Sequence, residues 1–177
     1  ASLADLRVRD LIIERGLRAA PEIDETLPVR EAIRELIEQR FTSALTRDED
    51  GTVAGVVTAR DLLVRLHENG CDGLEDRCAD FATPRHKIAW CAPEDPIDKT
   101  QALMRTLGVR NLPVAQNGEV LGMLTAKDIG DYLMELRTST KTKEAFLETT
   151  AARRGLPVNS KTVSSERLQT MVSALAG

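Results

Sequence analysis

The chain has 177 residues, of which 42% are hydrophobic and 29% charged, and its formal net charge is −4. This composition is ordinary for a soluble globular protein, and the length allows one domain or two small ones. The acidic balance and the scattered Lys and Arg residues argue against nucleic acid or an anionic membrane surface as a partner. No apolar run in the sequence approaches the length needed to span a bilayer.

A zinc site or a set of disulfides would have to be built from Cys71, Cys78, Cys91, His67 and His86. The odd cysteine count does not form a disulfide framework, and without a C-x-x-C pair no metal site is expected. We therefore expect reduced thiols and an intracellular, cytoplasmic location. A targeting peptide for organelle import that had been removed would leave no trace in this sequence.

In chain order, the first predicted element is an extended stretch ending at Pro21, followed by an amphipathic helix. Thr26 is its predicted N-cap, with Pro28 just inside the start. Two strands joined by the turn Asp48–Gly51 come next, and a second helix begins within the phrase "GVVTARD" at Gly55–Asp61. The apolar stripe of the first helix consists of Val29, Ala32, Ile33, Leu36 and Ile37.

The same order of elements is written a second time further along the chain. The phrase "GMLTAKD" at Gly122–Asp128 repeats the first phrase at an offset of 67 positions (122 − 55). The stretch Leu27–Phe41 aligns with Asp95–Val109, and the dipeptide Asn117–Gly118 predicts the turn of the second hairpin. An extended stretch at Lys87–Pro93 precedes the second copy of the helix. Each unit therefore reads β-α-β-β-α.

A three-stranded sheet with two helices is small for an independent domain, so the two units are expected to pack together as a pseudo-twofold pair. The predicted boundaries are 1–70 for the first repeat, 71–137 for the second and 138–177 for a helical C-terminal tail. In the tail, Lys143–Arg154 and Ser165–Ala174 are each predicted to form a helix. The tail is expected to dock on the repeats or on a partner, or else to form a partly disordered end.

Tandem β-α-β-β-α units, each with Gly-apolar-apolar-Thr-x-x-Asp opening its last helix, resemble a pair of CBS (cystathionine β-synthase) domains, a Bateman module. The resemblance covers Val8 to Leu136. It implies an α+β fold with clefts between the repeats that bind adenosine derivatives: AMP, ADP, ATP, S-adenosylmethionine or NAD. These would be regulatory ligands and not obligatory cofactors. The resemblance also implies a homodimer that modulates a partner protein which the sequence does not identify.

In this family the Asp of the Thr-x-x-Asp motif accepts hydrogen bonds from ribose hydroxyls, and the Thr contacts phosphate or ribose. The resemblance therefore assigns Thr58 and Asp61 to one cleft, and Thr125 and Asp128 to the other. Free N–H groups at a helix N-terminus suit phosphate oxygens, and a carboxylate can accept from two vicinal hydroxyls. The glycine ahead of the Thr is expected to let a ligand approach the backbone closely.

Phosphate groups also need basic or polar partners. The resemblance assigns this role to Arg60, Lys127, Arg110 and Asn111. At the positions of Arg110 and Asn111 the first repeat has Thr42 and Ser43, which leaves it with fewer cations. The two clefts are therefore expected to be unequal.

Helix capping alone is the competing explanation of each Thr-x-x-Asp motif, because Thr is a favoured N-cap and Asp suits the first turn. Under that explanation the protein is a ligand-free dimerisation or protein-interaction module. Trp90 could stack on adenine but is expected in the core, and His86 is expected in a solvated loop. No nucleophile elbow, Walker loop or H-E-x-x-H motif is present, so the chain is not expected to be an enzyme.

Overall fold

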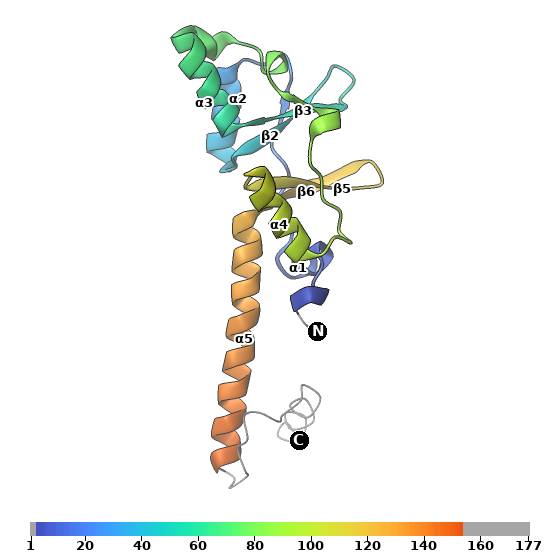
Figure 1. Cartoon of the computed structure of the whole chain (residues 1–177), viewed down its shortest axis with the longest axis vertical. Helices are drawn as coiled ribbons and strands as arrows, with labels where there is room; N and C mark the ends of the chain where they lie inside the picture. The colour runs from blue at the N-terminus through green and yellow to red at the C-terminus, as the bar shows by residue number, and fades with distance from the viewer. Residues whose placement is uncertain (1–2, 154–177) are drawn as a thin grey trace. The chain divides into compact units, whose positions relative to one another are not determined.

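The computed structural model describes residues 3–153. They divide into two compact units, one that ends at Gly130 and one that begins at Asp131. The first unit contains both copies of the repeated order of elements as far as the start of the last helix (Figure 1). The α+β fold class, with tandem repeats as a pseudo-twofold pair, is confirmed.

The elements alternate between helices and short strands. The first part of the chain forms η1 (Leu3–Asp5), α1 (Val8–Arg15), β1 (Glu22–Asp24), α2 (Val29–Gln39), β2 (Ser43–Arg47), β3 (Val53–Thr58) and α3 (Ala59–Asn69). The next part forms η2 (Gly70–Glu75), η3 (Cys78–Asp80), β4 (Thr83–Pro84), η4 (Arg85–Lys87), α4 (Ile97–Leu107), β5 (Asn111–Gln116), β6 (Glu119–Thr125) and α5 (Ala126–Arg153).

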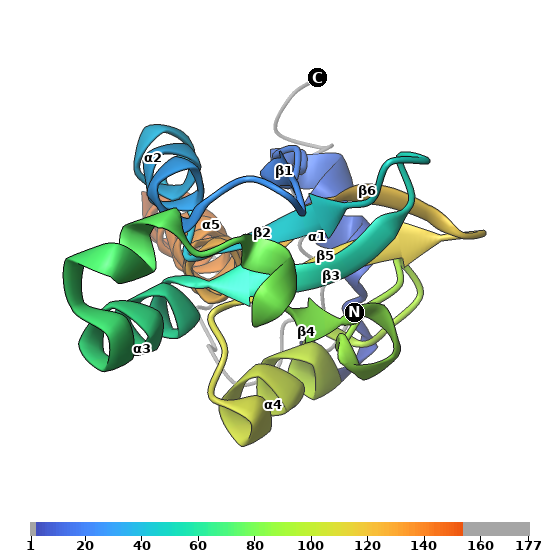
Figure 2. The ribbon, with the colours of Figure 1, turned by 90° about the horizontal axis from the view of Figure 1, so that it is seen from above.

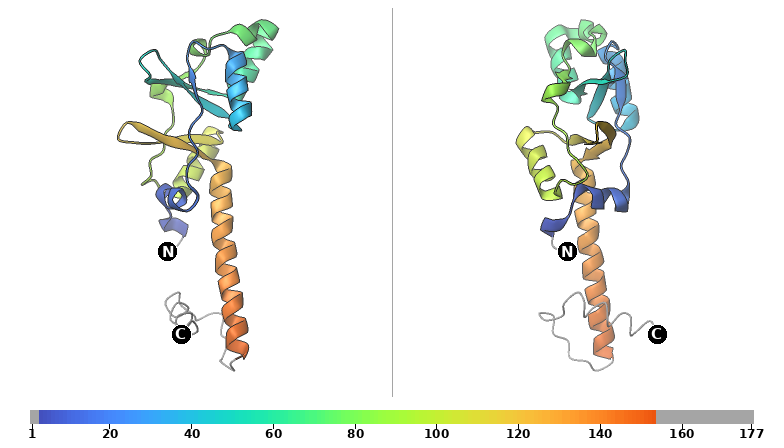
Figure 3. Two further views of the ribbon diagram at one scale, coloured as in Figure 1. Left: turned by 180° about the vertical axis from the view of Figure 1, so that it is seen from behind. Right: turned by 90° about the vertical axis from the view of Figure 1, so that its right-hand side faces the viewer.

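Two sheets with matching strand order form the centre of the first unit. One sheet has the order β1-β2-β3-β4, with β1 parallel to β2 and the other pairs antiparallel (Figure 2). The other is the antiparallel hairpin β5–β6, extended at each edge by a one-residue bridge. Cys91 pairs in parallel with Val114 of β5, and Arg18 pairs antiparallel with Met123 of β6. Hairpins β2–β3 and β5–β6 point in the same direction, one above the other (Figures 1 and 3).

Each repeat lends a segment of backbone to the other. Arg18 precedes β1 of the first repeat but pairs with β6 of the second. In the matching exchange, β4 belongs to the second repeat but pairs with β3 of the first repeat. The starts of two helices are also bonded to the other repeat. The Val8 N–H of α1 donates to the Asp95 carbonyl, and the Val29 N–H of α2 donates to the Asp76 carbonyl, both at 2.9 Å. The two repeats are therefore interlaced.

The glycines that open the repeated phrases lie where these segments cross. A Cβ on Gly55 would come closer than 3.0 Å to the carbonyl oxygen of Thr83, and a Cβ on Gly122 would come equally close to that of Arg18. The expectation that these glycines admit a ligand is therefore wrong. The backbone of the other repeat occupies the space beside them.

Buried apolar side chains from both repeats form a common cluster. On α2, Val29, Ala32 and Leu36 are buried as the apolar stripe predicts, whereas Ile37 is 71% exposed. The stripe is therefore narrower than predicted. The buried members of the cluster are Ile23, Val29, Ala32, Leu36, Phe41, Ala44, Val57, Leu62, Cys78 and Met123.

Some local predictions are corrected by the structure. Thr26 does not cap α2: Pro28 is the N-cap residue, without a side-chain cap, and Thr26 Oγ1 donates to Asp24 Oδ1 at 2.6 Å. The strand predicted to end at Pro21 instead begins after it, because the preceding segment pairs with the other repeat through Arg18. In the second copy, the predicted extended stretch pairs with a strand only at Cys91.

The second unit contains the continuation of α5, which runs unbroken to Arg153 (Figure 1). The predicted helix over Lys143–Arg154 is confirmed as far as Arg153, but it is a continuation of the last helix of the second repeat and not a helix of its own. The predicted helix at Ser165–Ala174 lies outside the described residues. Within residues 3–153, no helix combines the length and the apolar character that crossing a membrane requires.

Candidate functional site

Both Thr-x-x-Asp motifs form reciprocal capping boxes. At α3 the Asp61 N–H donates to Thr58 Oγ1 (3.1 Å), and the Thr58 N–H donates to Asp61 Oδ2 (2.9 Å). At α5 the Asp128 N–H donates to Thr125 Oγ1 (3.0 Å), and the Thr125 N–H donates to Asp128 Oδ2 (3.3 Å). The predicted N-caps Thr58 and Thr125 are thus confirmed, and each pair of residues stabilises the start of its helix.

The capping box of α3 leaves groups that can still bind a ligand. The Ala59 N–H donates to the Thr42 carbonyl at 2.8 Å, and the Asp61 N–H is used by the box. The Arg60 N–H lies in the same first turn, where an α-helix leaves its N–H groups without a carbonyl partner four residues earlier in the helix. The half-buried Asp61 carboxylate also keeps Oδ1, because the box uses only Oδ2. One N–H donor and one carboxylate oxygen are therefore available within a single helical turn.

These groups open into a cleft of about 460 Å³, which we call the α3 cleft. Its wall includes the first turn of α3, the start of β2 and residues 108–113 at the end of α4 and the start of β5. Both repeats thus contribute to it, and an apolar side is formed by Val56, Ile88 and Leu112. The predicted site residues that the α3 cleft brings together are Thr58, Arg60, Asp61, Arg110 and Asn111.

Asn111 joins the two repeats at the base of the cleft. Its Oδ1 accepts hydrogen bonds from the Thr42 N–H (3.1 Å), Thr42 Oγ1 (2.6 Å) and Ser43 Oγ (3.2 Å). The residues that align in sequence between the repeats are therefore in direct contact. With its oxygen used in this way, Asn111 can offer a ligand only its Nδ2 hydrogens.

Two guanidinium groups give the α3 cleft a cationic rim. Arg60 projects from the first turn of α3, and Arg110 directly precedes β5; both are exposed. Among the side chains that the structure describes, no carboxylate forms an ion pair with Arg60 or Arg110. An anionic ligand could therefore recruit both without displacing an existing salt bridge.

The remaining predicted residues, Thr125, Lys127 and Asp128, lie at the start of α5 and do not line the α3 cleft. The first repeat's counterparts of Arg110 and Asn111 are Thr42 and Ser43, which provide hydroxyl groups and no charge. The predicted phosphate-binding positions of the two repeats therefore differ in charge.

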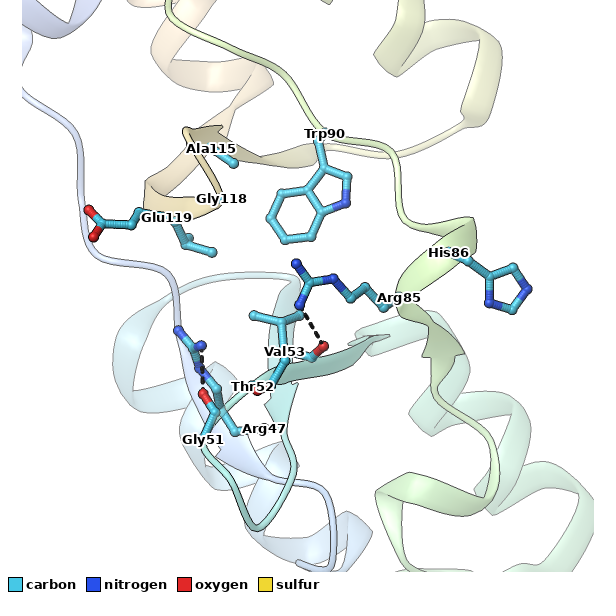
Figure 4. Close-up of a pocket in the computed structure, with 11 residues that line it drawn as sticks. Arg47, Gly51, Thr52, Val53, Arg85, His86, Trp90, Ala115, Gly118 and Glu119 are labelled. Atoms are coloured by element: carbon cyan, nitrogen blue, oxygen red, sulfur yellow. Dashed lines mark hydrogen bonds between the residues drawn. The ribbon is translucent and has the colours of Figure 1, made fainter.

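Trp90 and His86 lie at a different cavity, between the turns of the two hairpins (Figure 4). Trp90 is half-buried there, so its predicted place in the core is wrong. In the part of the chain whose side chains the structure describes, no group of three or more His, Cys, Asp or Glu residues is placed to hold a metal ion. Cys71 is exposed, and Cys78 and Cys91 are buried; all are free thiols.

Interlaced β-α-β-β-α repeats with a cleft between them define the class of protein, a tandem-repeat α+β module. A family model of the CBS domain matches residues 8–68 and 78–135, more than half of the chain. The chain therefore belongs to the CBS domain family, and the resemblance seen in the sequence is confirmed.

Two curated proteins are similar to parts of the chain. The L-aspartate semialdehyde sulfurtransferase of Methanosarcina acetivorans is 27% identical over 112 residues, which are 63% of this chain and 21% of that protein. The mitochondrial CBS domain-containing protein CBSX3 of Arabidopsis thaliana is 26% identical over 81 residues, 46% of this chain and 39% of that protein. The matched part is thus well under half the length of either relative.

Solved CBS structures resemble the fold closely. A CBS-domain protein from Agrobacterium tumefaciens matches with a TM-score of 0.65 at 23% identity, covering 72% of this chain and 92% of that one. A CBS domain protein from Pyrobaculum aerophilum, complexed with AMP, matches with a TM-score of 0.61 at 25% identity, covering 75% and 99%. A CBS domain pair in complex with 5′-methylthioadenosine and S-adenosyl-L-methionine matches with a TM-score of 0.61 at 20% identity, covering 73% and 97%.

Proposed function

We propose that this chain is a regulatory module that binds an adenosine derivative in the α3 cleft and modulates a partner protein. One observation carries the proposal: the cleft gathers the Thr-x-x-Asp motif of the first repeat and Arg110 of the second. The AMP complex of the Pyrobaculum aerophilum protein and the adenosyl ligands of the related domain pair support this ligand class.

Each part of such a ligand has a chemical counterpart in the cleft. The Asp61 carboxylate can accept from a ribose hydroxyl, and the Arg60 N–H with the two guanidinium groups can donate to phosphate oxygens. The apolar side, with Val56 and Leu112, suits a purine ring. AMP, ADP and ATP use all of these groups, and NAD uses them through its pyrophosphate. S-adenosylmethionine has no phosphate and can offer the cationic rim only the carboxylate of its methionine part.

Calorimetry with AMP, ADP, ATP, S-adenosylmethionine and NAD tests the proposal. We expect saturable binding of at least one, and a higher melting temperature with excess ligand, about 2.7 kcal/mol of added stability at a hundredfold excess over Kd. Absence of binding by all of them at millimolar concentration would contradict the proposed function.

The Asp61→Asn variant tests the residue assignment. Its amide oxygen can still accept the Thr58 N–H, so α3 should stay capped while the charged acceptor for ribose is lost. We expect affinity to fall about tenfold or more, because a hydrogen bond to a charged group is worth roughly 1.5–3 kcal/mol. Asp128→Asn should remove binding only at a second cleft, which a change in stoichiometry would reveal.

Asp10→Asn is the matched control, because Asp10 Oδ2 accepts the Arg7 N–H in the capping box of α1. Its affinity for nucleotide should equal that of the unmodified protein. If Asp10→Asn and Asp61→Asn weaken binding equally, Asp61 acts through helix stability and not through ribose.

The capping boxes favour a second candidate function, a ligand-free dimerisation or interaction module. They give Thr58 and Asp61 a structural role without any ligand. In both candidates we expect a homodimer, which exposed apolar side chains on the neighbouring helices α2 and α3 support: Ile37 is 71% and Leu63 67% exposed. The nucleotide panel separates the two candidates, since only the first predicts binding.

A further inference from the structure

The larger cavity, of about 900 Å³, opens between the turns of the two hairpins, and we call it the hairpin pocket. Its walls are residues 51–53 at the β2–β3 turn and 118–120 at the β5–β6 turn, with Arg47 and Ala115 on the strands that lead into these turns. Figure 4 shows these groups around an open centre. No residue of the Thr-x-x-Asp motifs lines it, so it is separate from the α3 cleft.

The strand registers explain why space exists here. Arg47 pairs with Val53 directly after an irregularity in the β2–β3 register, and Ala115 pairs with Val120 directly after the same kind of irregularity in β5–β6. Arg47 and Ala115 are thus equivalent positions of the two repeats. The small Ala115 side chain leaves open the volume that a second arginine would fill.

Residues 85–90, which lead into the helix and hairpin of the second repeat, contribute Arg85 and Trp90 to the pocket. Among the described residues, no equivalent segment of the first repeat lines it. Arg85 extends from η4 into the space between Trp90 and Val53, as Figure 4 shows, and its Nη1 donates to the Val53 carbonyl at 3.4 Å. Trp90 is half-buried, and its ring lies next to the guanidinium in Figure 4. The pocket therefore combines an aromatic surface with an anchored cation.

The charges of the pocket leave one guanidinium without a counterion. Arg47 is neutralised by Glu22 through a 2.5 Å ion pair and is also held by the Gly51 carbonyl at 2.9 Å. Arg85 has no carboxylate partner among the described residues. Glu119 also lines the pocket, but its carboxylate points away from Trp90 and Arg85, as does the His86 ring (Figure 4).

We infer that the hairpin pocket binds a small monoanionic ligand with a flat apolar body, an aromatic carboxylate. The Arg85 guanidinium has a fork of donors that matches a carboxylate in a bidentate pair. The Trp90 ring offers a face for stacking, and Val53, Ala115 and Val120 give apolar walls. A polyphosphate suits the pocket poorly, because only one uncompensated cation faces its centre.

Trp90 is the single tryptophan of the chain, so its fluorescence reports directly on this pocket. We would titrate the full chain with benzoate and with phenylacetate, and in parallel with the neutral isostere benzamide. We expect a saturable fluorescence change with a carboxylate, with a dissociation constant on the order of 1 mM for so small a ligand. Benzamide should bind at least about tenfold more weakly, because it lacks the charge.

Arg85→Gln should weaken carboxylate binding about tenfold or more and should abolish the preference over benzamide. Lys87→Gln is the matched control, an exposed cation of the same η4 turn that does not line the pocket. It should bind benzoate like the unmodified protein. Saturating AMP should not compete with benzoate, so this proposal stands or fails separately from the nucleotide cleft.

Three results would overturn the inference: no saturable response to either carboxylate at millimolar concentration, equal affinity for benzoate and benzamide, or equal losses in Arg85→Gln and Lys87→Gln. In Trp90→Phe, calorimetry replaces fluorescence, and benzoate binding should persist with reduced affinity. Retention of full affinity in both Trp90→Phe and Arg85→Gln would place the ligand elsewhere.

Discussion

Gly55 and Gly122 hold equivalent positions in the two repeats, and at each the backbone of the other repeat lies against the Cα. The Cβ of an alanine would meet the carbonyl oxygen of Thr83 or Arg18. We expect Gly55→Ala and Gly122→Ala each to lower the free energy of unfolding by about 1–3 kcal/mol, because a packed contact must shift. Urea denaturation measures this loss.

Gly130→Ala is the control for these glycine variants, because Gly130 lies in α5 and a Cβ there would meet nothing within 4 Å. It should raise stability by about 0.5–1 kcal/mol through helix propensity. If all three variants changed stability alike, the close backbone approach at Gly55 and Gly122 would not be the reason for their glycines.

The cysteines should differ sharply in reactivity. Burial raises the pKa of Cys78 to about 11 and that of Cys91 to about 12, so both remain protonated thiols near neutral pH. Cys71 is exposed. Brief treatment of the native protein with iodoacetamide should therefore give one adduct by mass spectrometry, at Cys71, and three after unfolding. Rapid native modification of Cys91 would contradict the packing around it.

At the scale of elements, Asp76 links the segment after η2 to α3. Its Oδ2 accepts from Asn69 Nδ2 (2.7 Å) and Arg65 Nε (2.8 Å). The Asn69 hydrogen bond, together with Arg65, holds the Asp76 pKa below the usual value of 3.8. Because the folded pKa is the lower one, this contribution to stability is present above pH 3.8 and is lost as the pH falls through the folded pKa.

Asp76→Asn should therefore be less stable than the unmodified protein at neutral pH, with the difference shrinking below pH 3.8. Urea denaturation across this range measures it. Asp72→Asn, which replaces a carboxylate of the neighbouring η2, is the control. A constant deficit for Asp76→Asn at every pH would show that its effect is steric.

Elements whose signals are local could be predicted from the sequence. The Asn117–Gly118 turn forms with both residues at positive φ, and Thr58 caps α3 as its spacing indicates. Predictions failed where the partner lies far along the chain. The strand position near Pro21 depends on the pairing of Arg18 with Met123, which no local pattern reveals.

For the site, the sequence predicted the residue types but not their grouping. Thr58, Asp61 and Arg110 share a cleft because the repeats are interlaced, and that arrangement depends on long-range strand pairing. The hairpin pocket was missed because its lining comes from three segments that lie far apart in the sequence, residues 47–53, 85–90 and 115–120. Its only local signal was Trp90 close to Arg85, which the expectation of a core tryptophan obscured.

At the scale of the whole molecule, the helical tail is open to a direct test. The segment 138–177 includes the later part of α5, which runs on to Arg153. If the tail is the assembly element, light scattering should give the mass of a monomer for a chain that ends at Arg137 and the mass of a dimer for the full chain. An unchanged dimer would show instead that assembly depends on the repeats, and Ile37→Glu on α2 would then be the variant to measure.

The exchange of Arg18 and β4 between the repeats has a consequence for how such a chain could arise. A single repeat on its own would lack the outer segment of its sheet. It could complete the sheet only by exchanging that segment with a second copy of itself. Fusion of two such copies into one chain would give the present arrangement. The halves 1–71 and 72–177, produced as separate polypeptides, should then recognise each other and reassemble, since each carries the missing piece of the other.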